Sequence, residues 1–247
     1  MFKKIITLLF LIVVAFGSAQ KYETGLEVMQ AFDAKEQPKS TIATTKMLIT
    51  SSSGQSLSRE MQMWSDGDNQ IIKFLAPADI KGSGFLSITK DDGSSETMIY
   101  LPALGRTRRI SSDKKDGSFF GSDFSYEDID FAGNDINDAS YEILDFSDGV
   151  YTIQAIPNDD SDSSYDKRVI YINEENLSPQ KIEFYIDDEL VKIMTIVETK
   201  EVSGYTVLSA LKMETIDSGS FTTIEQSDIE LDKEIPAEVF SERFLRK

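Results

Sequence analysis

Five cationic side chains lie within ten residues, from Arg106 to Lys115, of a chain whose formal net charge is −18. Guanidinium groups bind carboxylates and phosphates through paired hydrogen bonds. On an extended strand, Arg106 and Arg108 point to one face and Arg109 to the other. We expect these arginines to form a polar rim for an acidic headgroup or a docking site for a partner. Ordinary salt bridges with the 43 acidic residues of the chain are the alternative.

An aromatic run interleaved with glycine and serine follows at residues 117–126. It contains Phe119, Phe120 and Phe124, and its glycines allow the backbone to bend sharply. Long loops in a compact domain are usually functional or mobile. We expect the three phenylalanines to form a lid over an apolar cavity. The alternative is a loop that packs them into the core.

The elements that must position these residues are predicted to be β-strands. Alternation of apolar and polar residues recurs from Ser40 onward, and Asp-Gly and Ser-Gly pairs typical of tight turns interrupt it about every ten positions. Many short consecutive strands predict an antiparallel barrel, partial barrel or large curved sheet. The predicted strands are 40–51, 56–66, 69–75, 84–90, 95–101, 105–111, 140–146, 149–156, 167–173, 180–187, 190–200, 204–216 and 219–230.

Helix is expected only at the margins of this sheet. Residues 24–36 have apolar side chains at helical spacing, with Thr24 as the N-cap and Glu27 three residues later. A short helix is predicted within 236–245, and residues 112–139 form a long ordered loop with a helical turn near 123–129. No linker or repeat divides residues 20–247, which we therefore interpret as a single domain.

A barrel or half-barrel of this strand number is too wide for side chains alone to fill, which favours an apolar cavity. Alternation places Met61 and Met63 on one strand face, and methionine is common on surfaces that accept variable apolar ligands. A filled core is the alternative. The predicted lining is Met61, Met63, Phe74, Phe85 and Met98.

The first nineteen residues have the organisation of a secretory signal peptide. Lys3 and Lys4 precede an apolar stretch, residues 5–16, and the small residues Gly17-Ser18-Ala19 follow, so we expect cleavage after Ala19. Twelve apolar residues are fewer than the roughly 20 that a membrane-spanning helix needs. Cleavage would remove two lysines and change the net charge from −18 to −20. Such a surface repels nucleic acid.

The composition excludes several kinds of chemistry. The chain has no histidine and no cysteine, so it has no disulfide, no imidazole or thiolate zinc site, no histidine-dependent triad and no cysteine nucleophile. The acid-rich stretch 158–162 lacks the glycine and glutamate of an EF-hand loop. We expect no cofactor and no metal. A hydrolase that uses carboxylates is a distant alternative, because no paired-acid motif is present.

Four segments resemble the outer membrane lipoprotein-sorting proteins, the lipoprotein-carrier-like (LolA-like) family of Gram-negative bacteria. They are Trp64–Gly67, Phe74–Gly84, Tyr100–Arg106 and Gly121–Asp128. The resemblance implies a strongly curved antiparallel sheet that forms an unclosed β-barrel, with a few helices as a lid. It also implies that the apolar space between sheet and helices holds acyl chains.

Carriers of this kind latch the lid with an arginine on an early strand. Here the strands within 40–66 offer only Lys46 and Arg59, so Arg59 is the candidate for that role. The resemblance implies a monomeric periplasmic carrier of lipoprotein acyl chains or other lipid. Such a carrier moves its cargo from an inner-membrane exporter to an outer-membrane acceptor, with only transient membrane contact. The alternative is a periplasmic lipid- or lipoprotein-sensing module that signals to a membrane partner.

Overall fold

The computed structural model describes residues 20–67, 69–90, 95–129, 136–159 and 161–247. The expected signal peptide and its cleavage position after Ala19 lie outside these residues. All thirteen predicted strands are present, with ends that shift by at most a few residues. They are β1 (Ser40–Thr50), β2 (Ser56–Asp66), β3 (Asn69–Ala76), β4 (Gly84–Thr89), β5 (Ser95–Leu101), β6 (Arg106–Ile110), β7 (Ala139–Ser147), β8 (Val150–Pro157), β9 (Lys167–Asn173), β10 (Pro179–Ile186), β11 (Glu189–Val202), β12 (Tyr205–Thr215) and β13 (Ser220–Leu231).

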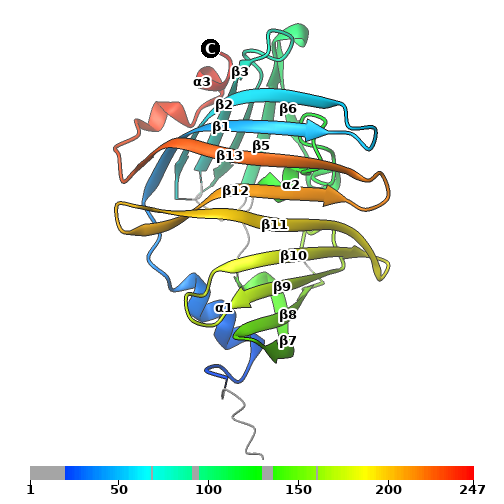
Figure 1. Cartoon of the computed structure of the whole chain (residues 1–247). Coiled ribbons are helices and arrows are strands. Elements are labelled where there is room, and N and C mark those ends of the chain that lie inside the picture. Colours follow the sequence, from blue (N-terminus) through cyan, green and yellow to red (C-terminus); the bar gives the residue numbers. More distant parts are fainter. Residues whose placement is uncertain (1–19, 68, 91–94, 130–135, 160) are drawn as a thin grey trace, which may run out of the picture.

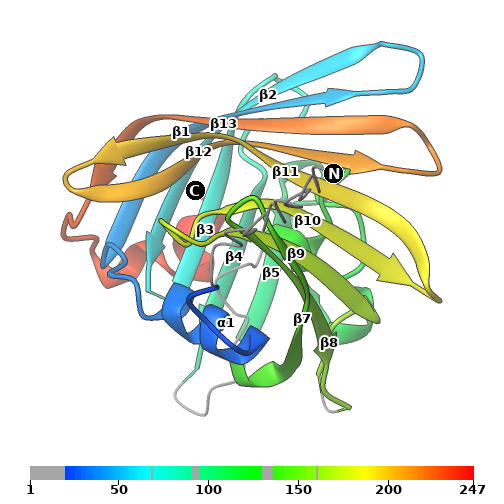
Figure 2. The same cartoon turned by 60° about the horizontal axis from the view of Figure 1, so that its bottom comes forward.

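The strands form one antiparallel sheet in the order β6-β5-β4-β3-β2-β1-β13-β12-β11-β10-β9-β8-β7. Strands that are consecutive in the sequence pair with each other, except β6 and β7, which do not pair; in addition, β1 pairs with β13. The sheet therefore has two edges, β6 and β7, and it curves strongly without closing (Figure 2). This confirms the expected unclosed barrel.

The two edge strands follow one another in the sequence. The chain between β6 and β7 must therefore travel from one edge of the sheet to the other. We call its described part, residues 111–129, the crossing segment; it includes a 3₁₀ turn at Ser112–Lys114 and α2 (Tyr126–Ile129). Figure 1 shows α2 behind β12, on the concave side of the sheet. The helical turn predicted near 123–129 is confirmed, and a further 3₁₀ turn, Ile136–Asp138, leads into β7.

Buried side chains form two separate clusters on the two faces of the sheet. The larger cluster lies on the concave side and includes Phe74, Phe85 and Ile99. The smaller cluster contains Ile71 and Leu86 and is covered by the C-terminal residues, a 3₁₀ turn at Ala237–Val239 and α3 (Glu242–Leu245). The helix predicted within 236–245 is thus a turn followed by a single helical turn.

The N-terminal helix α1 (Gly25–Asp33) begins with the predicted capping box. The Thr24 hydroxyl accepts a hydrogen bond from the backbone N–H of Glu27, and the Glu27 carboxylate accepts one from the backbone N–H of Thr24. The helix packs against β7 at one end of the sheet (Figure 1). None of the helices in the described ranges is both long and apolar enough to cross a bilayer.

Candidate functional site

The crossing segment contributes its aromatic rings to the concave cluster. Phe119 is fully buried, and its ring centroid lies 5.5 Å from that of Phe85 and 5.0 Å from that of Phe120. The Phe120 ring lies 4.5 Å from the ring of Phe74 on β3. Phe124 is also buried and belongs to the same cluster. The run therefore packs its phenylalanines into the core and at the same time covers the concave face.

Four of the five predicted lining residues belong to the concave side. Met61, Phe74 and Phe85 are buried in its cluster, and Met63 packs against that cluster. Met98 does not join them. It lies in the smaller cluster on the convex face, because the strand register pairs it with Leu86, whose side chain points away from the concave side.

Arg59, on β2 in the N-terminal half of the sheet, contacts the crossing segment. Its guanidinium donates a hydrogen bond to the backbone carbonyl oxygen of Phe120 and lies 5.9 Å from the centroid of the Phe74 ring. Burial lowers the pKa of Arg59, and the nearby charge of Asp79 partly offsets this effect. The Nε atom of Arg59 is buried and has no hydrogen-bond partner among the residues that the structure describes. An arginine on an early strand thus contacts the segment that covers the concave face.

Asp123 ties the crossing segment to the centre of the sheet. Its buried carboxylate accepts hydrogen bonds from the hydroxyl groups of Thr215, at 2.7 Å, and Thr222, at 2.6 Å. The hydroxyl of Ser220 donates a third, and the backbone N–H of Asp123 donates to the Thr222 hydroxyl at 3.0 Å. All three hydroxyl groups come from the facing ends of β12 and β13.

Glu127 makes a second tie between the crossing segment and the C-terminal half of the chain. Its carboxylate accepts hydrogen bonds from Arg168 on β9, at 2.6 Å, and from the Ser163 hydroxyl, at 2.7 Å. The backbone N–H of Ser164 donates to the same carboxylate at 2.9 Å. A buried carboxylate is therefore paired with a cation and with hydrogen-bond donors, as burial of a charge requires.

Asp128 makes a third tie, to β11. Its carboxylate lies 2.9 Å from the Lys192 ammonium and 2.9 Å from the Tyr165 hydroxyl that donates to it. Burial, together with the Asp128 charge, raises the pKa of Tyr165. The sequence analysis did not single out the carboxylates of Asp123, Glu127 and Asp128. The sequence does contain a signal that could have identified them. Three carboxylates, at 123, 127 and 128, lie in a run that otherwise contains only aromatic and small residues.

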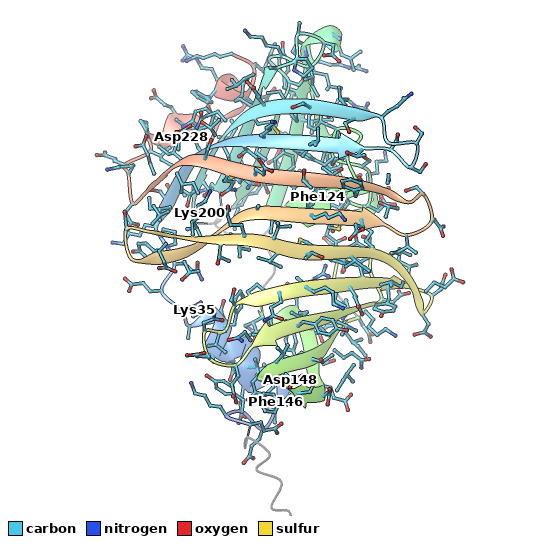
Figure 3. All side chains as sticks on the ribbon, viewed as in Figure 1. Lys35, Phe124, Phe146, Asp148, Lys200 and Asp228 are labelled. Atoms are coloured by element: carbon cyan, nitrogen blue, oxygen red, sulfur yellow. The ribbon has the colours of Figure 1, made fainter. Side chains whose placement is uncertain are left out.

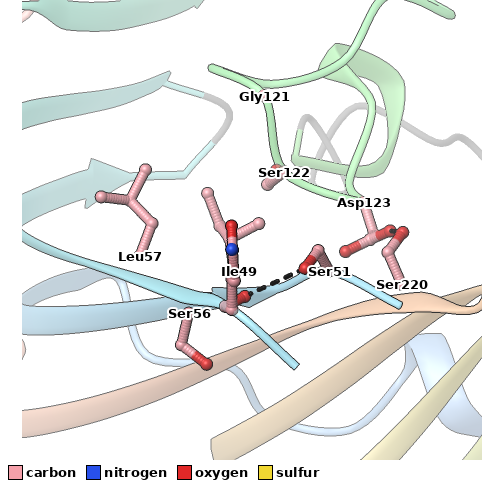
Figure 4. Close-up of a pocket in the computed structure, with 9 residues that line it drawn as sticks. Ile49, Ser51, Ser56, Leu57, Gly121, Ser122, Asp123 and Ser220 are labelled. Atoms are coloured by element: carbon pink, nitrogen blue, oxygen red, sulfur yellow. Dashed lines mark hydrogen bonds between the residues drawn. The ribbon is translucent and has the colours of Figure 1, made fainter. Parts of the chain in front are cut away.

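A pocket of about 430 Å³ opens beside the Asp123 tie (Figure 4). It lies between the hairpin that joins β1 to β2 and the start of the Gly121–Asp128 stretch. Its walls carry hydroxyl, amide and aliphatic groups and a single carboxylate, with no lysine or arginine. The lining residues are Ile49, Ser51, Gln55, Ser56, Leu57, Gly121, Ser122, Asp123 and Ser220.

A family model with the description "Uncharacterized protein" matches residues 66–247, which is well over half of the chain. The chain belongs to this family. No curated protein matches it.

Solved structures with similar folds cover 90% of this chain. A putative outer membrane lipoprotein-sorting protein domain from Vibrio parahaemolyticus is 29% identical, with a TM-score of 0.81 over 98% of that chain. A DUF1329 family protein from Desulfovibrio piger is 24% identical, with a TM-score of 0.82 over 97% of its chain. A LolA superfamily protein from Nitrosomonas europaea is 19% identical, with a TM-score of 0.73 over 100% of its chain. The expected LolA-like fold is confirmed.

The arginine cluster lies apart from the concave cluster, on the edge of the LolA-like sheet. Arg106, Arg108 and Arg109 are all exposed on β6. Arg106 and Arg108 share a face with Ile110, which packs against the concave cluster, whereas Arg109 points to the other face and binds Glu96 at 2.7 Å. The predicted division of the three side chains between two faces is confirmed. The salt bridge of Arg109 agrees with the ordinary alternative for that residue.

The described part of the chain contains no group of three acidic side chains arranged to hold a metal ion. The carboxylates of Asp123, Glu127 and Asp128 each bind donors of the protein itself. Their arrangement positions the crossing segment on the sheet.

Proposed function

We propose that this chain is a periplasmic carrier, without enzymatic activity, that binds acyl chains of lipoproteins or other lipids. The acyl chains would lie between the concave face of the sheet and the crossing segment, and the carrier would move them between the inner and outer membranes. The observation that carries the proposal is the construction of the crossing segment. It places phenylalanines in an apolar core, yet a small set of separate polar contacts holds it on the sheet.

The free energy of replacing the lid phenylalanines in the core by an acyl chain is compatible with this role. Burial of a methylene group gains about 0.8 kcal/mol, so ten methylenes gain roughly 8 kcal/mol. An acyl chain that replaces the rings of Phe119, Phe120 and Phe124 would compensate for their loss from the core. A ligand that binds only the open form shifts the population toward that form. Release then needs only a partner that favours the closed form of the empty protein.

The proposed binding surface combines sheet and crossing segment. Met61, Met63, Phe74 and Phe85 would line the sheet side, and the three phenylalanines would form the lid. Arg59 would act as the latch, because it is the residue of an early strand that binds the lid backbone. The Vibrio domain, 29% identical, is described as a putative lipoprotein-sorting protein, which supports the same class of cargo.

The first test is native mass spectrometry of protein isolated gently from the periplasm, followed by lipid extraction. A bound acylated species of defined mass is expected. An empty protein that also fails to take up a fluorescent fatty-acyl probe would contradict the carrier and favour the sensing module. Absence from the periplasmic fraction would contradict the location.

A second test locks the lid. The chain has no cysteine, so Asp123→Cys with Thr222→Cys would introduce one disulfide between the crossing segment and β13. These residues are already joined by two hydrogen bonds. The oxidised protein is expected to lose uptake of the probe, and reduction should restore it. Each single substitution is the matched control and should be insensitive to reductant. Equal uptake by the oxidised double variant would contradict a lid in this segment.

A further inference from the structure

The two edges of the sheet differ in what packs against them. At β7, helix α1 packs so closely that a Cβ atom on Gly25 would lie 2.9 Å from the backbone N of Glu142 and from the backbone C of Tyr141. At β6, strand pairing within the described residues involves β5 alone. An edge strand offers unpaired backbone N–H and C=O groups on its outer side. Among the described residues, one edge is therefore covered and the other remains available.

The available edge also carries an unusual concentration of positive charge. Arg106, Arg108, Lys114 and Lys115 form no ion pair among the residues that the structure describes. Arg109 binds Glu96, but 74% of its side chain is exposed. The chain has 25 basic and 43 acidic residues, and five of the basic residues lie between Arg106 and Lys115. Unpaired cations gathered on one short strand and the turn after it indicate a surface for an anionic partner.

We propose that β6 is the docking site for an acidic, extended segment of a partner protein, which adds to the sheet as a further strand. Main-chain hydrogen bonds to the free edge would hold the segment, and side chains would give specificity. Arg106 and Arg108 would bind carboxylates on the concave side, and Arg109 would bind one on the convex side. This inference does not depend on the carrier role, because Arg106, Arg108 and Arg109 are exposed and are not part of the concave cluster.

The geometry favours a strand over a membrane surface. A flat anionic bilayer contacts cations that lie on one side of an element, whereas the three arginines alternate between two faces of β6. A strand with acidic residues on both faces matches this alternation. The strand has five residues, so the docked segment would be short and its binding transient and sensitive to salt.

The test uses the whole protein and, as the probe, a fluorescent peptide with two Glu-Glu-Val-Val repeats, which places glutamates on both faces of an extended strand. Binding measured by anisotropy at low salt is expected to weaken at least tenfold in the Arg106→Glu, Arg108→Glu double variant. The matched control is Lys35→Glu with Lys200→Glu, which changes the net charge equally and lies on other elements (Figure 3). This control should weaken binding less than threefold. Circular dichroism checks that both variants fold.

A second peptide separates strand addition from simple charge attraction. The same sequence with an N-methyl group on every backbone amide keeps all its carboxylates but has no N–H donor along either edge, so it cannot donate strand hydrogen bonds. It is expected to bind at least tenfold more weakly, and the unmodified peptide should protect residues 106–110 from hydrogen exchange. Equal binding of both peptides would overturn the proposal.

Two further outcomes would also overturn it. If neither peptide binds, the cations serve only to prevent association of sheet edges. If vesicles of phosphatidylcholine with about one third phosphatidylglycerol bind in an Arg106-dependent way while the peptide does not, the surface is a membrane contact.

Discussion

The guanidinium of Arg59 on β2 donates a hydrogen bond to the backbone carbonyl oxygen of Phe120, which lies 61 residues later in the chain. The carbonyl belongs to the stretch that covers the concave face, so one side chain joins the first half of the sheet to its cover. The Nε atom of Arg59 has no hydrogen-bond partner within the described ranges, and burial lowers the pKa of the Arg59 side chain. The contact between Arg59 and Phe120 therefore forms at a cost in desolvation of the guanidinium, which is compatible with the proposed latch.

Replacement of Arg59 by methionine is expected to loosen the crossing segment more than it destabilises the protein. A hydrogen bond from a charged donor contributes about 1.5–3 kcal/mol. Its loss should therefore raise the opening equilibrium of residues 117–128 by roughly tenfold or more, since about 1.4 kcal/mol corresponds to a factor of ten. Hydrogen exchange measured by mass spectrometry checks this. Lys46→Met, at an exposed position of the neighbouring strand β1, is the control.

An unchanged exchange rate in the Arg59 variant would mean that the aromatic cluster and the three carboxylate ties hold the crossing segment by themselves. The latch role would then be wrong.

Asp128→Asn is expected to destabilise the whole fold. The change leaves the largely buried Lys192 ammonium without its carboxylate, and loss of one partner of a buried ion pair costs about 3–5 kcal/mol. Removal of the negative charge should also lower the pKa of Tyr165 toward its usual value. Urea unfolding measures the first effect. Asp116→Asn, at an exposed position of the same segment, should change the free energy of unfolding by less than about 0.5 kcal/mol.

Met61 and Met98 provide a matched pair that separates the two faces of the sheet. Both side chains are buried, so either change to alanine should cost about 2–5 kcal/mol of stability. Only Met61→Ala should alter the affinity for an acyl probe, because Met98 lies in the convex cluster with Leu86. Probe titration of both folded variants decides this. An equal loss of affinity in the two variants would contradict the proposed position of the cargo.

Glu183 on β10 is expected to make stability depend on pH in the acid range. Burial works to raise the pKa of its carboxyl, but hydrogen bonds from Lys181, at 2.8 Å, and Tyr185, at 2.9 Å, outweigh it and lower the pKa below the usual 4.5. A carboxyl with a lowered folded-state pKa stabilises the fold above its unfolded pKa. That contribution is lost as the pH falls through the folded-state pKa.

The Tm of Glu183→Gln should therefore lie below that of the natural protein at pH 7, and the gap should narrow below about pH 4.5. Burial and the Glu183 charge also raise the pKa of Tyr185 to about 12. Ultraviolet titration of the variant should accordingly show one tyrosine that ionises at lower pH than before. A gap in Tm that is constant with pH would contradict this account.

Much of the fold follows from local chemistry in the sequence. Alternation with a period of two residues and Gly-containing turns located all thirteen strands, because strand geometry and positive-φ turns depend on residues close together in the chain. The start of α1 was predictable for the same reason, since a capping box involves only Thr24 and Glu27. The alternating directions of Arg106, Arg108 and Arg109 also needed nothing beyond the strand.

The tertiary structure decided the relationships that cross between strands. Met98 and Phe85 both have buried, apolar side chains, and only the register of β4 against β5 places them on opposite faces of the sheet. The hydrogen bond of Arg59 to Phe120 and the bonds of Asp123 to β12 and β13 join residues 61 to 99 positions apart. Local propensity carries no information about such pairs. They form because the β6–β7 connection must cross a sheet whose edges are far apart in space, and that distance is set by the pairing of β1 with β13.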